Sequence, residues 1–497
     1  MSSIYATVPK AAGVEARLAK AKPYMGIPQS NLTLLLPLVA VVCLVVPWGV
    51  FVLPVCAIYV LLVVAPMQLK AYFATVDVSA DKSVASIKPV EKLTPLEDRE
   101  FDVVVFGVTG HSGFLLAEYL VMQYASKGNL KIALAGRNAK KLAAAREKLA
   151  INSHPSALDL PLLFADSSND ASLEDMCMRT KVVGTTVGPF LKYGESLVRA
   201  CARTGTGYCD LTGETGFAEI AYAKYNKVAV ETGARVVSFT GFDSVPADVG
   251  TIEVVKKFKA KFGKAPAQVD CVYSKLGGEA AGGTIDTVVH LLENGLPPTI
   301  VGKKDQPTKK GEASMTLPFV YYNRYAESWT IPFFMAPVNS KVVEWTNNEI
   351  GHSPKLSYNE VMGMPNISSV IIGSLLGMIG GSFFVMKATR DLIFSMGWLP
   401  KPGVGPSRAK IAKGYSLATF YASSADGKCV ESLRWANIGD PGGFATALYQ
   451  GECCVALVKD SDRPGPRPTG AGLTVGMCIG ADVMLERLND SGFLNIV

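Results

Sequence analysis

The chain has 497 residues, 49% of them hydrophobic and 19% charged, which excludes a disordered chain and allows about three domains. Lys and Arg number 49 against 43 Asp and Glu, and a net charge of +6 over this length gives no reason to expect nucleic acid as a partner. The ten Cys and four His form no pair with zinc-ligand spacing, so we expect no metal site and thiols in a reducing compartment.

The N-terminal part combines a basic tail, residues 1–30, with a strongly apolar segment, residues 31–70. No charged residue stands between Leu32 and Met67, and this stretch starts too late and runs too long for a secretory signal. A bilayer span needs about 20 residues, and prolines would interrupt a continuous helix here. A kinked span and a hairpin that returns to the same face both stay open, beside a buried helical hairpin of a soluble fold. Cations on both flanks favour the cytosolic face for both ends, so we expect membrane lipid as a partner.

A second uncharged stretch, residues 361–386, is rich in glycine and serine between Glu360 and Lys387. Small residues suit close helix packing in lipid, and they equally suit a surface hairpin that covers a protein core. A second membrane contact and a surface hairpin therefore stay open as alternatives.

Strand–helix alternation follows a polar linker, residues 71–98, and occupies residues 99–260. The expected strands are short apolar runs at 101–106, 131–135, 160–164, 181–186, 208–211 and 234–238, and the clearest helices are 113–126 and 138–150. Such alternation predicts an α/β fold with a Rossmann-type, doubly wound parallel sheet. Residues 261–437 predict an inserted α+β domain with a mixed sheet, and residues 438–497 predict helices that pack back on the first domain.

A glycine-rich turn joins the first expected strand to the first expected helix. Its candidate cofactor-binding residues are Gly107, Thr109, Gly110, His111, Ser112 and Gly113. In such a turn the first glycine permits the bend, the second lets the backbone approach a diphosphate, and the third lets helix and strand pack closely. Because free N–H groups at the start of the helix face the anion, the turn predicts a dinucleotide cofactor.

The ends of the next strands bear on which dinucleotide binds. NAD-selective sites usually carry an acid at the end of the second strand, where this chain has Arg137 and Asn138. A guanidinium can pair with a 2′-phosphate, so we expect NADP(H) in preference to NAD(H), unless Arg137 is only a surface residue. Asp166, after the third strand, would contact adenine or cap a helix. The expected ribose and nicotinamide contacts follow the fourth strand, at Thr186, Val187 and Gly188.

Candidate proton donors follow strand ends further along the chain. We assign Tyr193 and Asp243 as the candidate catalytic acids, with Glu214 and Ser244 as further candidates. Each also stands where a side chain of its kind caps a helix or stabilises a turn, and this alternative stays open. No Tyr has a Lys four residues later, so the Tyr-x-x-x-Lys pair of short-chain dehydrogenases is absent.

These motifs together resemble the saccharopine dehydrogenase-like oxidoreductases, which include bacterial trans-acting enoyl reductases and vertebrate lipid-droplet-associated members. The matching stretches are VVVFGVTGHSGFLLAEYL, ALAGRNAKKL, TTVGPFLKYGESLVRACARTGTGYCDLTGE, SFTGFDSVPADVG, LPKPGVGPS and IGDPGGFATALYQGE. The resemblance implies a Rossmann domain with an inserted β-rich domain. Two features depart from the family pattern: the apolar segment 31–70, and His111-Ser112 in place of the more usual Phe-Thr.

Two functions from different classes fit these observations. The first is a membrane-associated, NADPH-dependent reductase of a lipophilic substrate, such as an enoyl or acyl chain of a glycolipid pathway, on the cytosolic face of a lipid droplet, the endoplasmic reticulum or another organelle membrane. The second is a scaffold or cofactor sensor at such a membrane, which keeps the fold without turnover. A homo-oligomer stays open under both.

Overall fold

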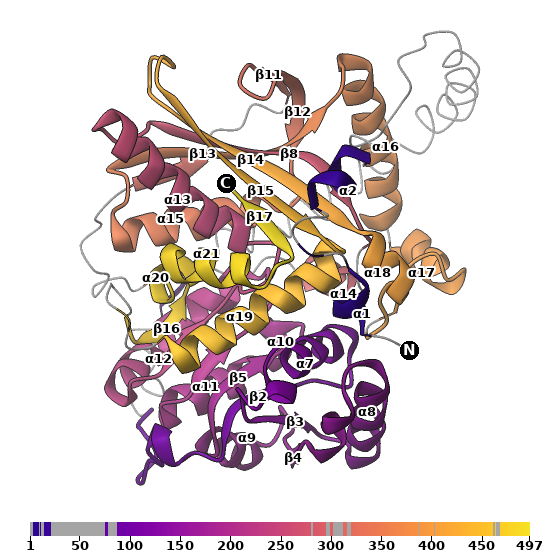
Figure 1. The fold of residues 1–497 in the computed structure, drawn as a ribbon, viewed down its shortest axis with the longest axis vertical. Coiled ribbons are helices and arrows are strands. Elements are labelled where there is room, and N and C mark those ends of the chain that lie inside the picture. Colours follow the sequence, from indigo (N-terminus) through magenta and orange to yellow (C-terminus); the bar gives the residue numbers. More distant parts are fainter. Residues whose placement is uncertain are drawn as a thin grey trace.

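The computed structural model describes two sheets in one molecule, a parallel sheet in one half and a mixed sheet in the other (Figure 1). The described residues are 3–8, 10, 14–20, 75–77, 87–279, 282–294, 299–301, 312–315, 320–385, 387–401, 403–460, 463 and 468–497. A separate two-stranded pairing joins β1 (Thr75–Asp77), inside the expected linker, to β9 (Thr299–Val301).

The parallel sheet has seven strands. In spatial order they are β16 (Gly470–Leu473), β7 (Arg235–Val237), β6 (Gly207–Cys209), β5 (Thr180–Thr185), β2 (Phe101–Phe106), β3 (Ile132–Gly136) and β4 (Leu162–Phe164). Six of them lie where short apolar runs predicted strands. The chain runs outward from β2 to β4 and then returns to β5 on the other side of β2. The order therefore reverses between β2 and β5, the place where doubly wound sheets bind ligands.

Helices cover both faces of this sheet because alternate residues of each strand point to opposite faces. Val103 and Val105 of β2 share a core with helices α7 (His111–Gln123), α8 (Ala139–Asn152) and α19 (Thr446–Lys459). Val104 and Phe106 share the other core with α9 (Asp170–Met178), α11 (Glu195–Thr204) and α12 (Thr215–Thr232). This arrangement confirms the Rossmann-type sheet that the sequence predicted.

The mixed sheet lies between β7 and β16 in the chain, apart from its last strand. Its strands are β8 (Gln268–Gly277), β10 (Glu312–Met315), β11 (Tyr321–Asn323), β12 (Ser328–Pro332), β13 (Lys355–Met364), β14 (Tyr415–Ser423), β15 (Val430–Ile438) and β17 (Leu494–Ile496). The long central strands β8, β13 and β14 bury Cys271, Tyr358 and Phe420 in one core. The remaining helices of this part are α13 (Val245–Phe262), α14 (Gly282–Asn294), α15 (Ala336–Ile350), α16 (Ile367–Val385), α17 (Lys387–Ser395) and α18 (Arg408–Lys413).

The C-terminal segment, residues 438–497, adds a strand to each of the two sheets, whereas the sequence predicted only helices there. Besides α19, α20 (Val475–Cys478) and α21 (Ala481–Asp490), it adds β16 to the edge of the parallel sheet and β17 to the edge of the mixed sheet. Both strands are too short, and β16 too rich in glycine, to show an apolar run in the sequence. They form because β7 and β15 offer backbone groups that need partners.

The N-terminal residues also differ from the expected basic tail. Helices α1 (Ile4–Thr7) and α2 (Val14–Lys20) bury Tyr5 and Leu18 in the main core. The carboxylate of Glu118, on α7, accepts hydrogen bonds from Ser3 Oγ (2.7 Å) and from the Ile4 amide (2.9 Å). Arg408 pairs with the same carboxylate through both terminal nitrogens, at 2.9 and 2.6 Å.

Of the two segments expected to contact a membrane, the structure describes only the second. Residues 31–70 lie outside the described residues. The stretch 361–386 supplies the end of β13 and the whole of α16. Within the part of the chain that the structure describes, we find no helix with both the length and the apolar character needed to cross a bilayer.

Candidate functional site

The glycine turn forms a tight bend between β2 and α7 that leaves no room for side chains at two positions. Gly107 has a φ of 98°, a conformation that suits only glycine well. A Cβ at Gly113 would overlap the carbonyl oxygen of Gly107 and stand 2.7 Å from Thr186 Oγ1. A Cβ at Gly110 would meet only the Gly107 oxygen, at 3.5 Å, so this glycine borders open space.

The start of α7 faces that space with unsatisfied backbone donors. Gly110 is the N-cap, and the first three helical residues are His111, Ser112 and Gly113. Their N–H groups have no carbonyl one turn earlier within the helix, and the helix dipole makes this end positive. A bend that only glycines allow, an open approach at Gly110 and free N–H groups together fit the diphosphate of a dinucleotide.

The end of β5 lies beside this bend, as the sequence predicted for one shared ligand. The Thr186 amide donates to the Phe106 carbonyl oxygen at 3.1 Å. A Cβ at Gly107 would stand 2.8 Å from Val187 Cγ2, so the two loops are in contact. Gly188 is exposed and forms a cis peptide with Pro189. The two loops on either side of the switch point therefore form one edge.

The ends of β3 and β4 place a cation next to an anion. Arg137 is exposed just after β3. Asn138 caps α8 by accepting from the Lys141 amide at 2.9 Å, which is a structural role. Asp166 accepts from the Ser168 amide (2.9 Å) and hydroxyl (2.8 Å). These bonds, and then the charge of Arg137, hold the pKa of Asp166 below its usual range. An exposed cation is thus present at the end of β3, with a carboxylate within its electrostatic range at the end of β4.

His111 connects the glycine turn to the mixed-sheet part of the chain. A Cβ at Gly405 would overlap its ring, and a Cβ at Gly443 would stand 3.5 Å from its Nε2. Burial, and then the charge of Lys148, lowers the pKa of His111. Its Nε2 is buried and has no hydrogen-bond partner among the described residues. Loops 403–405 and 440–443 therefore border the turn, although the sequence analysis did not assign them to the site.

The candidate acid Tyr193 ends the short helix α10 (Phe190–Tyr193) and is 38% exposed. It lines a cavity of about 280 Å³ between the end of β4 and the start of α11, together with Ser167, Leu191, Lys192, Glu195, Ser196, Arg199 and Tyr225. The Lys192 Nζ lies 5.0 Å from the centre of the Tyr193 ring. This polar cavity lies on the α9–α11 face of the sheet.

The candidate acid Asp243 lies in the loop after β7, next to the mixed sheet. Its backbone oxygen accepts from Asn339 Nδ2 at 2.6 Å, and Ser244 Oγ donates to Asn339 Oδ1 at 2.8 Å. Burial raises the pKa of Asp243 to about 6. Glu214 caps α10 instead, accepting from the Phe190 amide (2.9 Å) and the Leu191 amide (2.8 Å). No contact in the described residues brings Tyr193 and Asp243 together.

Gln450 is a residue at this edge that the sequence analysis missed. From α19 its side-chain nitrogen donates to the carbonyl oxygens of Thr185 (2.9 Å) and Cys209 (3.1 Å), at the ends of β5 and β6. Its side-chain oxygen is buried without a partner in the described part of the chain. The signal was a polar residue within the apolar stretch of α19.

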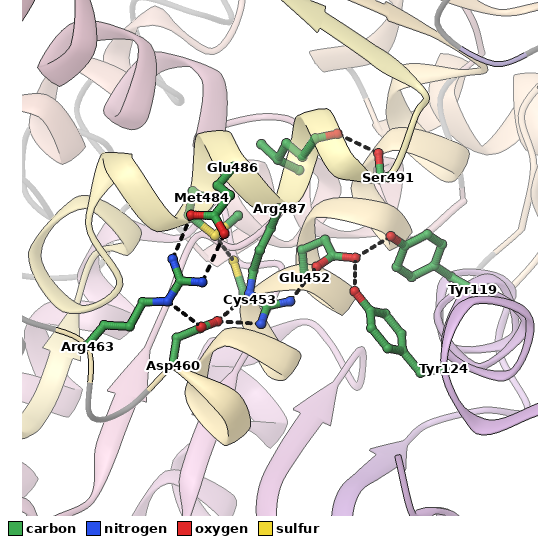
Figure 2. A network of polar contacts seen from close by, with 11 residues as sticks. Tyr119, Tyr124, Glu452, Cys453, Asp460, Arg463, Met484, Glu486, Arg487 and Ser491 are labelled. Carbon is green, nitrogen blue, oxygen red and sulfur yellow. Dashed lines mark hydrogen bonds and ion pairs between the residues drawn. The ribbon is translucent and has the colours of Figure 1, made fainter. Parts of the chain in front are cut away.

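A buried ionic network joins α19 to the C-terminal end of α7 (Figure 2). Glu452 of α19 accepts from the Tyr119 hydroxyl and from the Tyr124 hydroxyl (2.6 Å), both at the far end of α7. Its second oxygen lies 3.2 Å from Arg487 Nη1, and Arg487 Nε donates to Asp460 at 2.5 Å. The donors around Glu452 stabilise its charge inside the core.

Comparison with known proteins assigns the chain to a family, although no family model matches it. Trans-acting enoyl reductases of Mycobacterium ulcerans and Mycobacterium bovis are 31% and 30% identical over 418 and 431 residues, which cover 79% and 80% of this chain and 97% and 98% of theirs. A Mycobacterium tuberculosis protein with a provisional assignment to that activity is 33% identical over 427 residues, 79% of this chain and 96% of its own. The solved saccharopine dehydrogenase of Saccharomyces cerevisiae covers 80% of this chain and 99% of its own at a TM-score of 0.43 and 14% identity, too distant to inform the site. The chain belongs to the same family as the trans-acting enoyl reductases.

Proposed function

We propose that the protein is a membrane-associated, NADPH-dependent reductase that acts on the carbon–carbon double bond of a lipophilic enoyl chain. The observation that carries the proposal is the open turn at Gly110 in contact with Thr186 and Val187. A dinucleotide laid across these two loops would reach from the end of β3 to the end of β5. The nicotinamide would supply hydride, and the chain would bind and orient it.

Arg137 supports NADPH over NADH. It is exposed at the end of β3, where an NAD-selective site would carry an acid instead. The charge of Arg137 contributes to the lowered pKa of Asp166, so this carboxylate lies within electrostatic range of the guanidinium. A phosphate carries more charge than one carboxylate and offers more acceptor oxygens. We therefore propose that Arg137 pairs with the 2′-phosphate when NADPH binds.

The substrate class follows from the relatives, which are described as trans-acting enoyl reductases. An enzyme that acts in trans receives a chain that another protein has built, and such a chain is apolar along most of its length. A protein that holds itself at a lipid surface raises the local concentration of such a substrate.

Exposed apolar side chains support the membrane assignment. Leu392, Met396 and Trp398 lie on α17 and directly after it, and Ile367 and Ile371 are exposed at the start of α16. Trp398 is 73% exposed, and tryptophan prefers the membrane–water interface. Lys387 and Lys401 are exposed before and after α17 in the chain; Lys387 pairs with Asp391 (2.7 Å), and Lys401 would attract anionic headgroups.

Both flanks of residues 31–70 are fastened to the same folded body. On the N-terminal side, Leu18 is buried and its carbonyl oxygen accepts from Lys275 of the mixed sheet. On the C-terminal side, Ile87 packs on the core of the parallel sheet, and the Val90 amide donates to the Arg203 carbonyl oxygen at 3.1 Å. In Figure 1, α1, α2, α16 and α17 lie along the same side of the view. We therefore favour attachment by a hairpin, with both ends on the cytosolic face.

The cofactor proposal is tested on the full chain by titrating NADPH and following its fluorescence. We expect saturable binding that Gly110→Asp abolishes, because a carboxylate there would repel the diphosphate. Turnover is then measured as NADPH oxidation with a long-chain 2-enoyl thioester. Binding with no turnover on any enoyl chain would replace the reductase with the scaffold or sensor. No binding, with Gly110→Asp indistinguishable from the wild type, would overturn both.

The membrane proposal is tested by flotation with vesicles of neutral and anionic phospholipids. We expect the full chain to float, deletion of residues 31–70 to weaken flotation strongly, and Leu392→Ser with Trp398→Ser to weaken it further. Exposed Leu158→Ser, on the parallel-sheet half of the molecule, is the matched control and should change nothing. Flotation that survives both sets of changes would contradict the assignment.

A further inference from the structure

The short helix α1 begins on a buried carboxylate of α7. Ser3 Oγ and the Ile4 amide donate to Glu118, at 2.7 and 2.9 Å. Glu118 is fully buried and also accepts from both terminal nitrogens of Arg408, the first residue of α18. One carboxylate therefore joins the N-terminal residues to α18 and to the helix that follows the glycine turn. In Figure 1, α1 lies beside these two helices.

The ring of Tyr5 extends this contact to the turn Pro441–Ala445. Its centre lies 4.5 Å from that of Phe444, in this turn, and 5.1 Å from that of Tyr119, on α7. The Tyr5 hydroxyl donates to the Leu115 carbonyl oxygen, in the first half of α7, at 3.4 Å. Tyr5 is only 4% exposed, so its ring is enclosed between α7 and the turn.

The two segments that α1 holds against α7 both reach His111, the first residue of α7. Gly405 lies shortly before α18, and a Cβ on it would overlap the His111 ring. Gly443 lies in the turn on which the tyrosine packs, and a Cβ on it would stand 3.5 Å from His111 Nε2. The preceding residue, Gly110, borders open space. The docked N-terminal residues therefore support both borders of the glycine turn while the approach to it stays open.

Helix α1 has two states, docked and released. It has four residues, and an isolated helix shorter than about 12 residues is marginal in water, so its helical form depends on the contacts with the body. On release, Glu118 loses the two donors from Ser3 and Ile4, and Phe444 loses the ring packed on it. A ligand that binds one of the two states better shifts the equilibrium toward that state.

We propose that docking of residues 3–8 and binding of NADPH at the glycine turn stabilise each other. This inference rests on the NADPH binding proposed above and concerns its regulation. The coupling is positive because the docked form holds both segments beside His111 and leaves Gly110 open. It is reciprocal, since the factor by which docking raises the affinity for NADPH is also the factor by which NADPH favours docking. A membrane that draws the N-terminal residues away from the body would therefore lower the affinity for NADPH.

The reciprocal effect is tested on the unmodified full chain by hydrogen–deuterium exchange with mass spectrometry. Saturating NADPH should slow exchange of the amides in residues 4–8 about ten-fold, because these amides exchange when α1 is released. The turn 425–428, which joins β14 to β15 and is mostly exposed, is the control and should exchange at the same rate with and without NADPH. Exchange in residues 4–8 that NADPH leaves unchanged would overturn the coupling.

The effect on affinity is tested by NADPH fluorescence. Tyr5→Ala should weaken NADPH about ten-fold, by a factor similar to the change in exchange. Tyr5→Phe keeps the ring and should bind almost as the wild type does, as should Lys10→Ala, which changes an exposed residue after α1. If Tyr5→Ala does not fold, the wild-type exchange decides alone.

The two proposals fail in different ways. A folded Tyr5→Ala chain with wild-type affinity for NADPH would overturn the coupling and leave the reductase intact. A wild type that binds no NADPH would overturn the reductase and the coupling together.

Discussion

The α-carbon of Gly113 faces the carbonyl oxygen of Gly107 so closely that any side chain on it would overlap that oxygen, whereas Gly110 between them borders open space. Two glycines of one turn therefore serve different purposes. Gly113 lets α7 lie directly on the end of β2, and Gly110 keeps the approach to the helix start clear.

Alanine substitutions should separate these two purposes. Gly113→Ala must displace the backbone of Gly107 and the side chain of Thr186, and we expect it to destabilise the fold by about 1–3 kcal/mol and to abolish NADPH binding. Gly110→Ala has room for its methyl group and should leave the melting temperature unchanged while weakening NADPH at least ten-fold. Thermal unfolding and NADPH fluorescence measure the two effects. Equal effects of the two variants on stability would contradict this division.

Arg137 should determine the preference between the two nucleotides. Arg137→Ala removes the cation from the end of β3, so the affinity for NADPH should fall about ten-fold, about 1.4 kcal/mol, while that for NADH stays the same. Lys140→Ala removes another exposed cation from the first turn of α8 and is the matched control. Calorimetric titration with both nucleotides measures the difference. A parallel loss for NADH would assign Arg137 to the fold instead.

The parallel sheet and the glycine turn could be predicted because their signals are local. Each of the strands β2 to β7 is a short apolar run, and the residues of the glycine turn are consecutive in the chain. Gln450 and Asn339 could not be assigned because only tertiary folding brings them to the sheet edge. The short strand β16 has no β-branched residue and forms only because β7 needs a partner.

Burial on β13 raises the pKa for loss of the Glu360 proton to about 8, and this shift predicts how stability depends on pH. The folded state binds this proton more tightly than the unfolded state, whose ordinary value is about 4.3. The contribution of this proton to the free energy of unfolding is therefore complete below pH 4. It is lost as the pH rises toward about 8. Urea unfolding of the wild type at pH 5, 7 and 9 should show this decline. Glu360→Gln carries no proton to lose, so its decline should be shallower, and an equal slope in both proteins would contradict the assignment.

The ionic network of Figure 2 has a buried end at Glu452 and an exposed end at Glu486. The two ends should differ in how much they contribute to the free energy of unfolding. Glu452→Ala leaves Arg487 and two tyrosine hydroxyls without their shared partner inside the core, and we expect a loss of about 3–5 kcal/mol. Arg463→Ala removes ion pairs with Glu486 at the surface (2.7 Å) and with Asp460 (2.8 Å), but Asp460 keeps Arg487 as a partner, so the change should cost less than about 1 kcal/mol. Chemical denaturation of both variants gives the comparison. Similar losses would mean that the network does not fasten α19 to α7.

We expect the Tyr5 side chain to hold helices α1 and α2 against the main core. Its buried ring lies 4.5 Å from that of Phe444 and 5.1 Å from that of Tyr119, centre to centre, so it touches both α7 and the turn that leads into α19. Tyr5→Ala removes this contact and should release α1 and α2, which limited trypsin digestion would detect as rapid cleavage at Arg17 or Lys20. Lys10→Ala removes only a cation 5.9 Å from the centre of the Phe493 ring and should leave digestion unchanged. If Tyr5→Ala resists trypsin as the wild type does, the N-terminal side of residues 31–70 is held by other contacts, and the hairpin would depend on Leu18 and Lys275 instead.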